Sequence, residues 1–582
     1  MSRRMTALTG LKRAAMFAAV VGLLVGCGAP AAPTAAPKAA EPTAAPEATQ
    51  APEPTAVPEA TQAAEPTTAP EVAAPQIPGL NLQADRKMYK GTLVVSTLQG
   101  SDPARDVSKA LAAAYKQVQP DVEIVFEGPP SGVGYPEWLG TQLAAGNIRP
   151  DLVSGNYQAT YAKYVDLLKY RFQTNPYTGK TWDEDLDWNF FPFVDAKGRK
   201  TMVPTESVHI FWFYNKDIFD KLGLQPPKTW DELAAACEKI QAAGTKCVAS
   251  NYVYKLNQWI LEIYWDQYMR TEQYLDLVRA QPGDFNYDEE KDGKYKWDPN
   301  DTMIDTKFNI NWSRYYAAIR DGKIKFDTPE MADFIRNLAK VFPKYASDSL
   351  FVDTTEYSQF LQQQVAVEID GTWMLPTINR DMKSLTNLAA ARAKELGISE
   401  TTKLQPFNWG TFENPLMTGP LVKASVRSIE SATGVYGSVI DKNADQVAMA
   451  VDFMMFWFSQ PGYQSFVDGG MKDPLTPDGY NAAGPVMVRN VVLPPGTQKI
   501  MDNIKMMGNA ENGLYLQMRL SIDSVDKESQ NKIKDALEGK ITPEEYATWL
   551  QKAWTDNFDA ILAKATLTKD DLDNPARDPA AK

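Results

Sequence analysis

The chain has 582 residues, with 60 Lys and Arg against 73 Asp and Glu and a formal net charge of −13. This acidic balance disfavours a nucleic-acid partner. His209 is the one histidine, so sites that depend on imidazole are not expected, and we predict no metal, no cofactor and no catalytic residues. A chain of this length usually needs more than one hydrophobic core, which predicts at least two lobes.

The chain begins with the features of an export signal. Four basic residues precede an apolar run from Ala14 to Val25, which is too short to span a bilayer. The sequence LVGC, which ends at Cys27, resembles a bacterial lipobox, in which cleavage leaves the cysteine as a lipidated first residue. The alternative is a buried cysteine that precedes an ordinary cleavage site. We predict a signal peptide over residues 1–26, lipidation of Cys27, and a location on the extracytoplasmic face of the cell membrane.

The segment that follows has a composition that cannot form a core. From Ala29 to about Pro78 nearly all residues are Ala, Pro, Thr, Glu or Gln, so we expect the chain to stay extended and solvated. About fifty residues at up to about 3.1 Å each could reach on the order of 150 Å. Residues 27–87 are therefore predicted to be a disordered tether that joins the lipid to a folded body.

The folded body starts with alternating strand and helix patterns. β-rich runs at 91–98, 122–127 and 151–155 alternate with helical patterns at 106–120 and 135–146. This order predicts a parallel sheet with right-handed crossovers. Ligands of such sheets meet the loops beyond the carboxyl ends of the strands, which here are residues 99–102, 127–135 and 155–158.

The segment Val203 to Leu233, VPTESVHIFWFYNKDIFDKLGLQPPKTWDEL, combines an aromatic strand with two helices. Gly223 can end the first helix, and Thr229 with Glu232 forms a capping box for the second. The segment resembles the signature of extracellular solute-binding proteins of the maltose-binding and related sugar-binding kind, the receptor components of ABC importers.

Other segments follow in the order of that family. They are PDLVSG at 150–155, VAVEIDGTW at 365–373, the helical run 444–466, and a terminal helix with a capping box of Thr542 and Glu545. The resemblance covers about Met88 to Asp559. Gln363 departs from it, because the family usually has glycine before the VAVEID strand, and Val367 stands where methionine is common.

The resemblance implies the fold class α/β, with two discontinuous lobes and a hinge, periplasmic-binding-protein-like and of type II. Lobe 1 is assigned residues 88–205 and 435–490, and lobe 2 residues 206–434 and 491–582. The chain should cross between the lobes near 204–209, near 433–438 and again beyond Pro485. Closure of the lobes over a solute would create a shape that ABC permease subunits can sense. We expect a monomer.

A sugar site needs flat aromatic platforms and a few polar partners for hydroxyl groups. Trp373 matches the stacking tryptophan of the family's G-x-W turn and is the first candidate. The other ligand-binding candidates lie at predicted crossings or after predicted strands: Tyr436, Glu206, Ser207, His209, Tyr157, Gln158, Gln99 and Trp409. Structural roles are the alternatives, such as a solvated loop for Glu206 and a core imidazole for His209. Weaker candidates are Trp138, Trp259 and Tyr515.

Two further patterns have a structural interpretation. An oxidising compartment permits a disulfide between Cys237 and Cys247, and the alternative is two small buried thiol side chains. The run from Asp288, DEEKDGKYKWDP, begins like a calcium loop, but Pro299 stands where a glutamate is required. We predict a charged surface insertion there.

The predicted function is capture of a small solute, most simply a mono- or oligosaccharide, for an ABC importer. A polyol phosphate, an organic anion or a peptide fragment are the alternative ligands. A secreted carbohydrate-active hydrolase is a second possibility, although no local motif singles out the two carboxyl groups that it needs. A glycan-binding surface lipoprotein without a transport role is a third.

Overall fold

The computed structural model describes residues 77–96, 106–129, 135–145, 148–153, 163–188, 194–348, 350–351, 356–399, 403–428, 430–431, 436–470, 484–502, 504, 520 and 522–581. The chain divides between Val72 and Ala73, and the described residues all belong to the second unit, Ala73–Lys582. The predicted signal peptide, Cys27 and most of the predicted tether lie outside the described residues.

The first of two sheets has the strand order β2-β1-β3-β10-β4. Its strands are β1 (Gly91–Ser96), β2 (Val122–Glu127), β3 (Leu152–Val153), β4 (Val203–Pro204) and β10 (Tyr436–Val439). β1 pairs in parallel with β2 and β3, as predicted, while β10 is antiparallel to both β3 and β4. Because β10 comes more than 200 residues after β4, this sheet is built from two separate parts of the chain.

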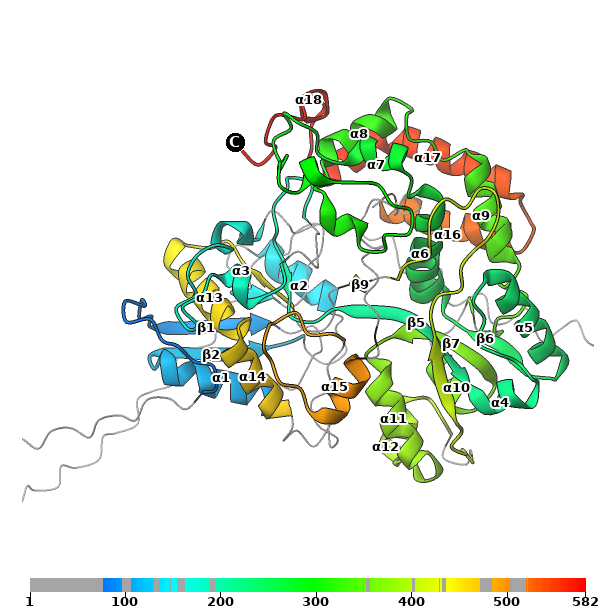
Figure 1. Ribbon diagram of the computed structural model, residues 1–582, viewed down its shortest axis with the longest axis horizontal. Helices are drawn as coiled ribbons and strands as arrows, with labels where there is room; N and C mark the ends of the chain where they lie inside the picture. Colours follow the sequence, from blue (N-terminus) through cyan, green and yellow to red (C-terminus); the bar gives the residue numbers. More distant parts are fainter. Residues whose placement is uncertain are drawn as a thin grey trace, which may run out of the picture. The chain divides into compact units, whose positions relative to one another are not determined.

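Helices from both parts of the chain cover the first sheet (Figure 1). They are α1 (Asp106–Val118), α2 (Tyr135–Ala144), α13 (Ala444–Trp457) and α14 (Gln460–Gly470). One face of α1 is buried at Leu111, Tyr115 and Val118, and it shares one core with Phe453 and Phe456 of α13. The shorter helices α3 (Trp182–Asp185) and α15 (Pro495–Met501) add Trp182 and Met501 to this core.

The second sheet has the order β6-β7-β5-β8, with β9 also paired to β5. Its strands are β5 (Val208–Asn215), β6 (Lys246–Ala249), β7 (Val365–Gly371), β8 (Trp409–Phe412) and β9 (Glu430–Ser431). β7, β8 and β9 are antiparallel to β5, and β6 is parallel to β7. Every residue of β5 and β7 is buried, because helices pack on both faces of the sheet. The two sheets confirm the predicted α/β class.

Local sequence signals set the helix ends near the second sheet. α4 (Lys216–Lys221) ends before Gly223, whose φ of +63° favours glycine. α5 (Trp230–Ala242) begins with the predicted capping box of Thr229 and Glu232. α17 (Pro543–Lys564) begins with that of Thr542 and Glu545. These predictions are confirmed.

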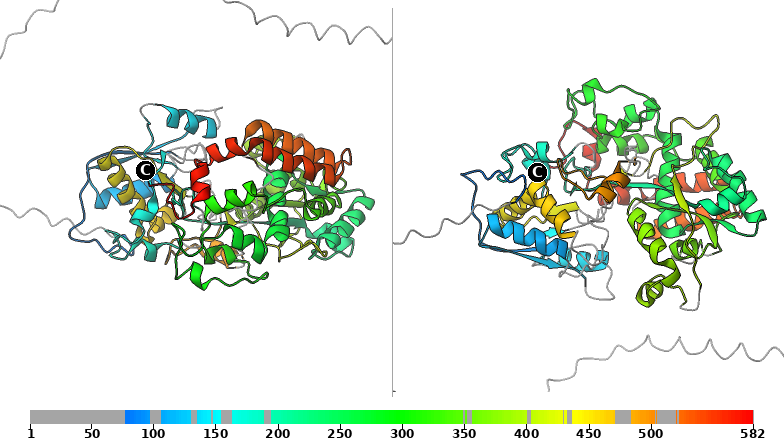
Figure 2. Two further views of the ribbon diagram at one scale, coloured as in Figure 1. Left: turned by 90° about the horizontal axis from the view of Figure 1, so that it is seen from above. Right: turned by 60° about the horizontal axis from the view of Figure 1, so that its bottom comes forward.

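The remaining α-helices and one π-helix belong to the part of the chain that holds the second sheet, and they pack on it or on one another (Figure 2). They are the π-helix η3 (Tyr252–Ile260), α6 (Leu261–Met269), α7 (Glu272–Val278), α8 (Trp312–Arg320), α9 (Pro329–Ala339), α10 (Glu356–Leu361), α11 (Met374–Ser384), α12 (Ala390–Glu395), α16 (Asp523–Leu537) and α18 (Lys569–Asp573). α9, α16 and α17 pack together. Within the described ranges, no helix combines the length and the apolar character needed to cross a membrane.

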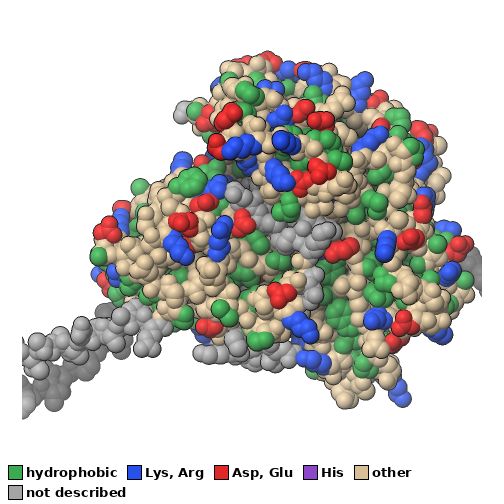
Figure 3. All heavy atoms as spheres, in the orientation of Figure 1, with side chains coloured by type: hydrophobic (Ala, Val, Ile, Leu, Met, Phe, Trp, Pro, Cys, Tyr) green, Lys and Arg blue, Asp and Glu red, His purple; other side chains and the backbone are tan. Residues whose placement is uncertain are grey.

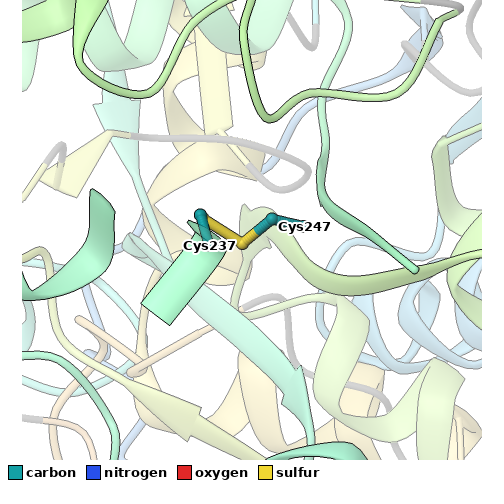
Figure 4. Close-up of a disulfide and its surroundings, with 2 residues drawn as sticks. All are labelled: Cys237 and Cys247. Atoms are coloured by element: carbon teal, nitrogen blue, oxygen red, sulfur yellow. A yellow bond between two sulfur atoms is a disulfide. The ribbon is translucent and has the colours of Figure 1, made fainter. Parts of the chain in front are cut away.

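A disulfide joins Cys237 of α5 to Cys247 of β6, with their Cα atoms 5.0 Å apart (Figure 4). Both cysteines are fully buried, so the bond fastens the inner face of α5 to the adjacent strand. On the face shown in Figure 3, basic and acidic side chains are intermingled. The predicted charged insertion at 288–299 is largely exposed or half-exposed.

Candidate functional site

Two segments between the sheets run side by side. The chain leaves the first sheet at Pro204 and enters the second at Val208. Ser207 N donates to Pro485 O over 2.8 Å, and Met487 N donates to Thr205 O over 2.7 Å. We call residues 205–207 and 485–487 the crossing region.

Gly484 allows the two segments to approach closely. A Cβ atom there would lie 2.0 Å from the carbonyl oxygen of Ser207, so no other residue fits without a shift of backbone.

The structure places the predicted residues Glu206 and Ser207 inside the crossing region. Each has only 1% of its surface exposed. The hydroxyl of Tyr463, on α14, donates to the Glu206 carboxylate. The interpretation of Glu206 as part of a solvated loop is therefore wrong, since its side chain ties α14 to the crossing region.

His209 lies two residues further on, in β5, and is fully buried. Its Nε2 is 2.8 Å from Oε2 of Glu413, a carboxylate whose side chain is about half exposed. The carbonyl of His209 accepts from Thr372 N over 3.0 Å. This backbone bond brings the turn after β7 against the start of β5.

Trp373 belongs to that turn and is half-buried. Its indole folds back over the backbone, because a Cβ atom on Gly371 would lie 2.2 Å from the indole ring. The ring meets Trp259 of η3 edge to face, with centroids 5.8 Å apart. The G-x-W pattern thus has a physical basis, since only glycine leaves room for the indole in this position.

Strand register decides which candidates share this end of the sheet. Gly371 is paired with Ile210, so Trp373 lies near the crossing region, together with Glu206, Ser207 and His209. The backbone of Tyr436 pairs with Pro204, which also places it near the crossing region. Trp409 is paired with Asn215, six residues along β5 from His209 and on the order of 20 Å away. The structure does not bring Trp409 together with the others.

The remaining candidates are not all described. Gln99, Tyr157, Gln158 and Tyr515 lie outside the described residues. Trp138 is half-buried on α2, where its ring packs against Tyr135 with centroids 5.8 Å apart.

Comparison with known proteins identifies the family. The model described as "Bacterial extracellular solute-binding protein" matches residues 102–464, more than half of the chain. The chain belongs to this family. Membership confirms the resemblance predicted from the sequence and the two-lobed, type II periplasmic-binding-protein-like fold class.

Relatives of this solute-binding protein are similar over part of their length. The melibiose/raffinose/stachyose-binding protein MelE of Bacillus subtilis is 25% identical over 196 residues, which are 33% of this chain and 43% of MelE. The sn-glycerol-3-phosphate-binding periplasmic protein UgpB of Salmonella typhimurium is 33% identical over 150 residues, which are 24% of this chain and 33% of UgpB. The matches thus span less than half of either relative. Among solved structures, apo RafE from Streptococcus pneumoniae is 15% identical, with 80% of this chain and 98% of RafE covered and a TM-score of 0.49.

The solute-binding protein also contains a buried charged cluster that sequence reasoning missed, formed by Lys255, Glu356, Glu368 and Asp370. Lys255 Nζ, on η3, donates to Asp370 Oδ2 over 2.7 Å and to Glu368 Oε1 over 3.0 Å, and lies 3.2 Å from Glu356 Oε1. We call these four residues the lysine–carboxylate cluster.

Burial and charge act against each other in this cluster. Burial is the largest influence on Glu368 and raises the pKa of its carboxyl to about 8, although the Lys255 charge opposes that rise. Burial disfavours the Lys255 ammonium as well, but Asp370, Glu368 and Glu356 together hold its pKa above the ordinary value. Burial therefore favours the protonated form of Glu368, while the surrounding carboxylates favour the charged form of Lys255.

One sequence signal could have found the cluster. Glu368 and Asp370 alternate with Val367 and Ile369 in β7, so both carboxylates point to the same face of a strand that is buried on both faces. Two acidic side chains in that setting need a buried cation, a proton or both to remove their charge. Within the described parts of the chain, no group of three or more His, Cys, Asp or Glu side chains is arranged to hold a metal ion.

Proposed function

We propose that this solute-binding protein is the lipid-anchored, substrate-binding component of an ABC importer. It captures a small solute, most simply a mono- or oligosaccharide, by hinge closure and delivers it to the permease subunits. Cys27 carries the lipid on the extracytoplasmic face of the membrane, and residues 27–87 form the tether. The observation that carries the proposal is the Trp373 indole, held beside the crossing region in a member of this family.

The proposed lobes keep the boundaries suggested by the sequence, 88–205 with 435–490 and 206–434 with 491–582. In support, strands of the first range pair only with one another in the described sheets, and so do those of the second. The exception is the last crossing: Leu493 and Met501 pack in the first core, so this crossing is proposed to follow Met501 rather than Asn490. The crossing region would bend as the hinge.

The sugar assignment is supported by the half-buried indole pair of Trp373 and Trp259. Indole faces pack on the apolar C–H faces of sugar rings, and polar groups nearby can orient the hydroxyl groups. Glu206, Ser207, His209 and Tyr436 are proposed for that polar role. MelE, by its name a binder of melibiose, raffinose and stachyose, supports the same solute class.

The test is a ligand panel of raffinose, melibiose and sn-glycerol 3-phosphate, followed by thermal unfolding and titration calorimetry. A sugar at about 100 times its Kd should raise the apparent free energy of unfolding by about 2.7 kcal/mol, because it binds only the native state. Chromatography of the same mixtures should recover the sugar unchanged. Cleaved products would instead support the alternative function, a carbohydrate-active hydrolase.

The Trp373→Ala variant tests the site itself. Loss of the indole should lower the affinity for the bound sugar about tenfold or more, since a stacked ring contributes in the range of 1 kcal/mol beyond its buried area. Trp549→Ala is the matched control, because Trp549 is a half-buried tryptophan of α17 whose Nε1 donates to Glu528. If Trp373→Ala and the wild type bind the sugar with equal affinity, Trp373 is not a ligand-binding residue.

A further inference from the structure

The two indoles of the candidate site stand on different elements that meet in the lysine–carboxylate cluster. Trp259 follows Lys255 by four residues on η3, and Trp373 follows Asp370 by three residues at the end of β7. The contact of 2.7 Å between Lys255 Nζ and Asp370 Oδ2 therefore joins the two elements that lead to the pair of rings.

The turn that carries Trp373 has a second link to the cluster. Oδ1 of Asp370 accepts a hydrogen bond from Gly371 N over 2.8 Å, so one carboxylate holds both the lysine and the turn. η3 is a π-helix, a rare conformation that is frequent at functional sites. Lys255 contacts three carboxylates on two other elements, α10 and β7, and thus fixes the position of η3 on the sheet.

The cluster has more negative than positive charge. Three carboxylates lie within 3.2 Å of one ammonium, and none of the four side chains is more than 10% exposed. The strand neighbours of Glu368 are uncharged, because β5 places Phe213 opposite it and β6 places Ala249. Asn251 donates its amide to Glu356, and the nearby Tyr357 donates to Asp381.

Two carboxylate oxygens also lack a hydrogen-bond partner among the described residues, Oε2 of Glu356 and Oε2 of Glu368. An ionised carboxylate with a bare oxygen is strongly disfavoured away from water. A proton on one of these carboxyl groups removes one negative charge. Glu368 is the group on which a proton is most favoured, because its side chain is the most deeply buried of the cluster.

We propose that the lysine–carboxylate cluster is a proton-holding clamp that positions Trp259 and Trp373, with the proton on Glu368. Lys255 and Glu368 are positioning residues in this arrangement, because they act on the indoles through η3 and β7. When Glu368 loses the proton, its charge competes with that of Asp370 for Lys255, the hold of Asp370 on Gly371 weakens, and the turn of Trp373 shifts. The effect on ligand binding rests on the proposed function, whereas the proton on Glu368 and the shift of the Trp373 turn do not.

The direction of the pH dependence follows from burial. Because burial raises the pKa of Glu368 to about 8, the clamp is complete at neutral pH and opens as the pH rises through about 8. If the ligand binds only the protonated form, its affinity falls by up to about tenfold for each pH unit above that value.

Infrared spectroscopy of the full chain tests the proton without a ligand. The wild type at pH 7 should show the C=O band of a protonated carboxyl group, and Glu368→Gln should lack it. Asp452→Asn is the matched control, because Asp452 is a buried carboxyl with a pKa raised only to about 6, so its replacement should leave the band in place. A wild type without the band overturns the proposal.

Tryptophan fluorescence tests the clamp. Emission of the ligand-free wild type should change in one step near pH 8, and the step should vanish in Glu368→Gln and shrink in Trp373→Phe. A step that persists in Glu368→Gln overturns the coupling, even where the infrared band is present. With raffinose as the probe, the affinity should fall between pH 7 and pH 9 in the wild type and stay level in Glu368→Gln. If raffinose does not bind at pH 7, that result contradicts the proposed solute. The infrared and fluorescence results, which need no ligand, then decide whether the clamp exists.

Discussion

Replacing Arg427 by methionine is expected to lower the free energy of unfolding by about 3–5 kcal/mol. The guanidinium of Arg427 is fully buried and donates from Nε and Nη2 to both oxygens of Asp266, over 2.9 and 2.6 Å. Nη1 donates to Oδ2 of Asp305 over 2.7 Å. Asp266 and Asp305 are themselves buried, so both carboxylates depend on partners inside the protein.

The expected loss of stability in Arg427→Met comes from the carboxylates of Asp266 and Asp305, which lose the guanidinium. Asp266 would keep Arg270, whose Nε lies 3.2 Å from its Oδ2. Asp305 would lose its hydrogen-bonded cation, and burial, the largest influence on its carboxyl, already raises its pKa even with Arg427 present. An unpaired buried carboxylate is the costly outcome, while the methionine itself fits an apolar interior.

Urea unfolding followed by tryptophan fluorescence measures the change. Arg336→Met is the matched control, because its partner Glu544 and Arg336 itself are both at least half exposed, and less than about 1 kcal/mol is expected. The double variant Arg427→Met with Asp305→Asn should recover part of the loss, since it removes the stranded charge. A loss below about 1 kcal/mol for Arg427→Met, or no recovery in the double variant, would refute the reasoning.

Three other substitutions probe the fold. Gln363 has a φ of +56°, so Gln363→Gly should stabilise the protein by about 0.5–1 kcal/mol in urea unfolding, and a destabilised variant would contradict this. Replacing Cys237 and Cys247 with serine opens a link between residues 10 apart and should cost about 2.5–3 kcal/mol, measured against the oxidised wild type; a cost near zero would show that the bond adds nothing. Burial raises the pKa of Asp452 to about 6, above its unfolded value near 3.8, so the folded state keeps a proton that the unfolded state releases between these values. The wild type should therefore lose stability relative to Asp452→Asn as the pH rises from about 4 to 6, by at most about 1.4 kcal/mol per unit, and a difference that does not vary with pH would exclude this linkage.

The features predicted correctly from the sequence depend on neighbours within a few positions. Thr229 and Glu232 are three residues apart, and their reciprocal hydrogen bonds form as soon as the first turn of α5 does. The positions of β2 and α1 were also predicted from local sequence patterns. Gln363 shows the limit of family patterns, since the backbone keeps the left-handed conformation even with a side chain in place of glycine.

The features that the sequence left open, and those that were missed, depend on distant residues. Trp409 was placed with the ligand-binding candidates, but the register of β8 on β5 puts it at the far end of the strand. Glu206 was open to interpretation as a solvated loop, but Tyr463, 257 residues away, buries it. Lys255 and Glu368 are 113 residues apart, and Asp266 and Arg427 are 161 apart.

The positions of strands and helices, the helix caps and the family signature could be predicted from the amino-acid sequence alone. Each of these depends on backbone geometry and on side chains within one or two turns. The partners of Lys255, Glu206 and Arg427, and the end of the sheet at which each indole lies, arose from packing of segments hundreds of residues apart. Burial is the physical reason for the difference: it turns exposed charges into groups that must find a partner, and the register of paired strands selects which partner is within reach.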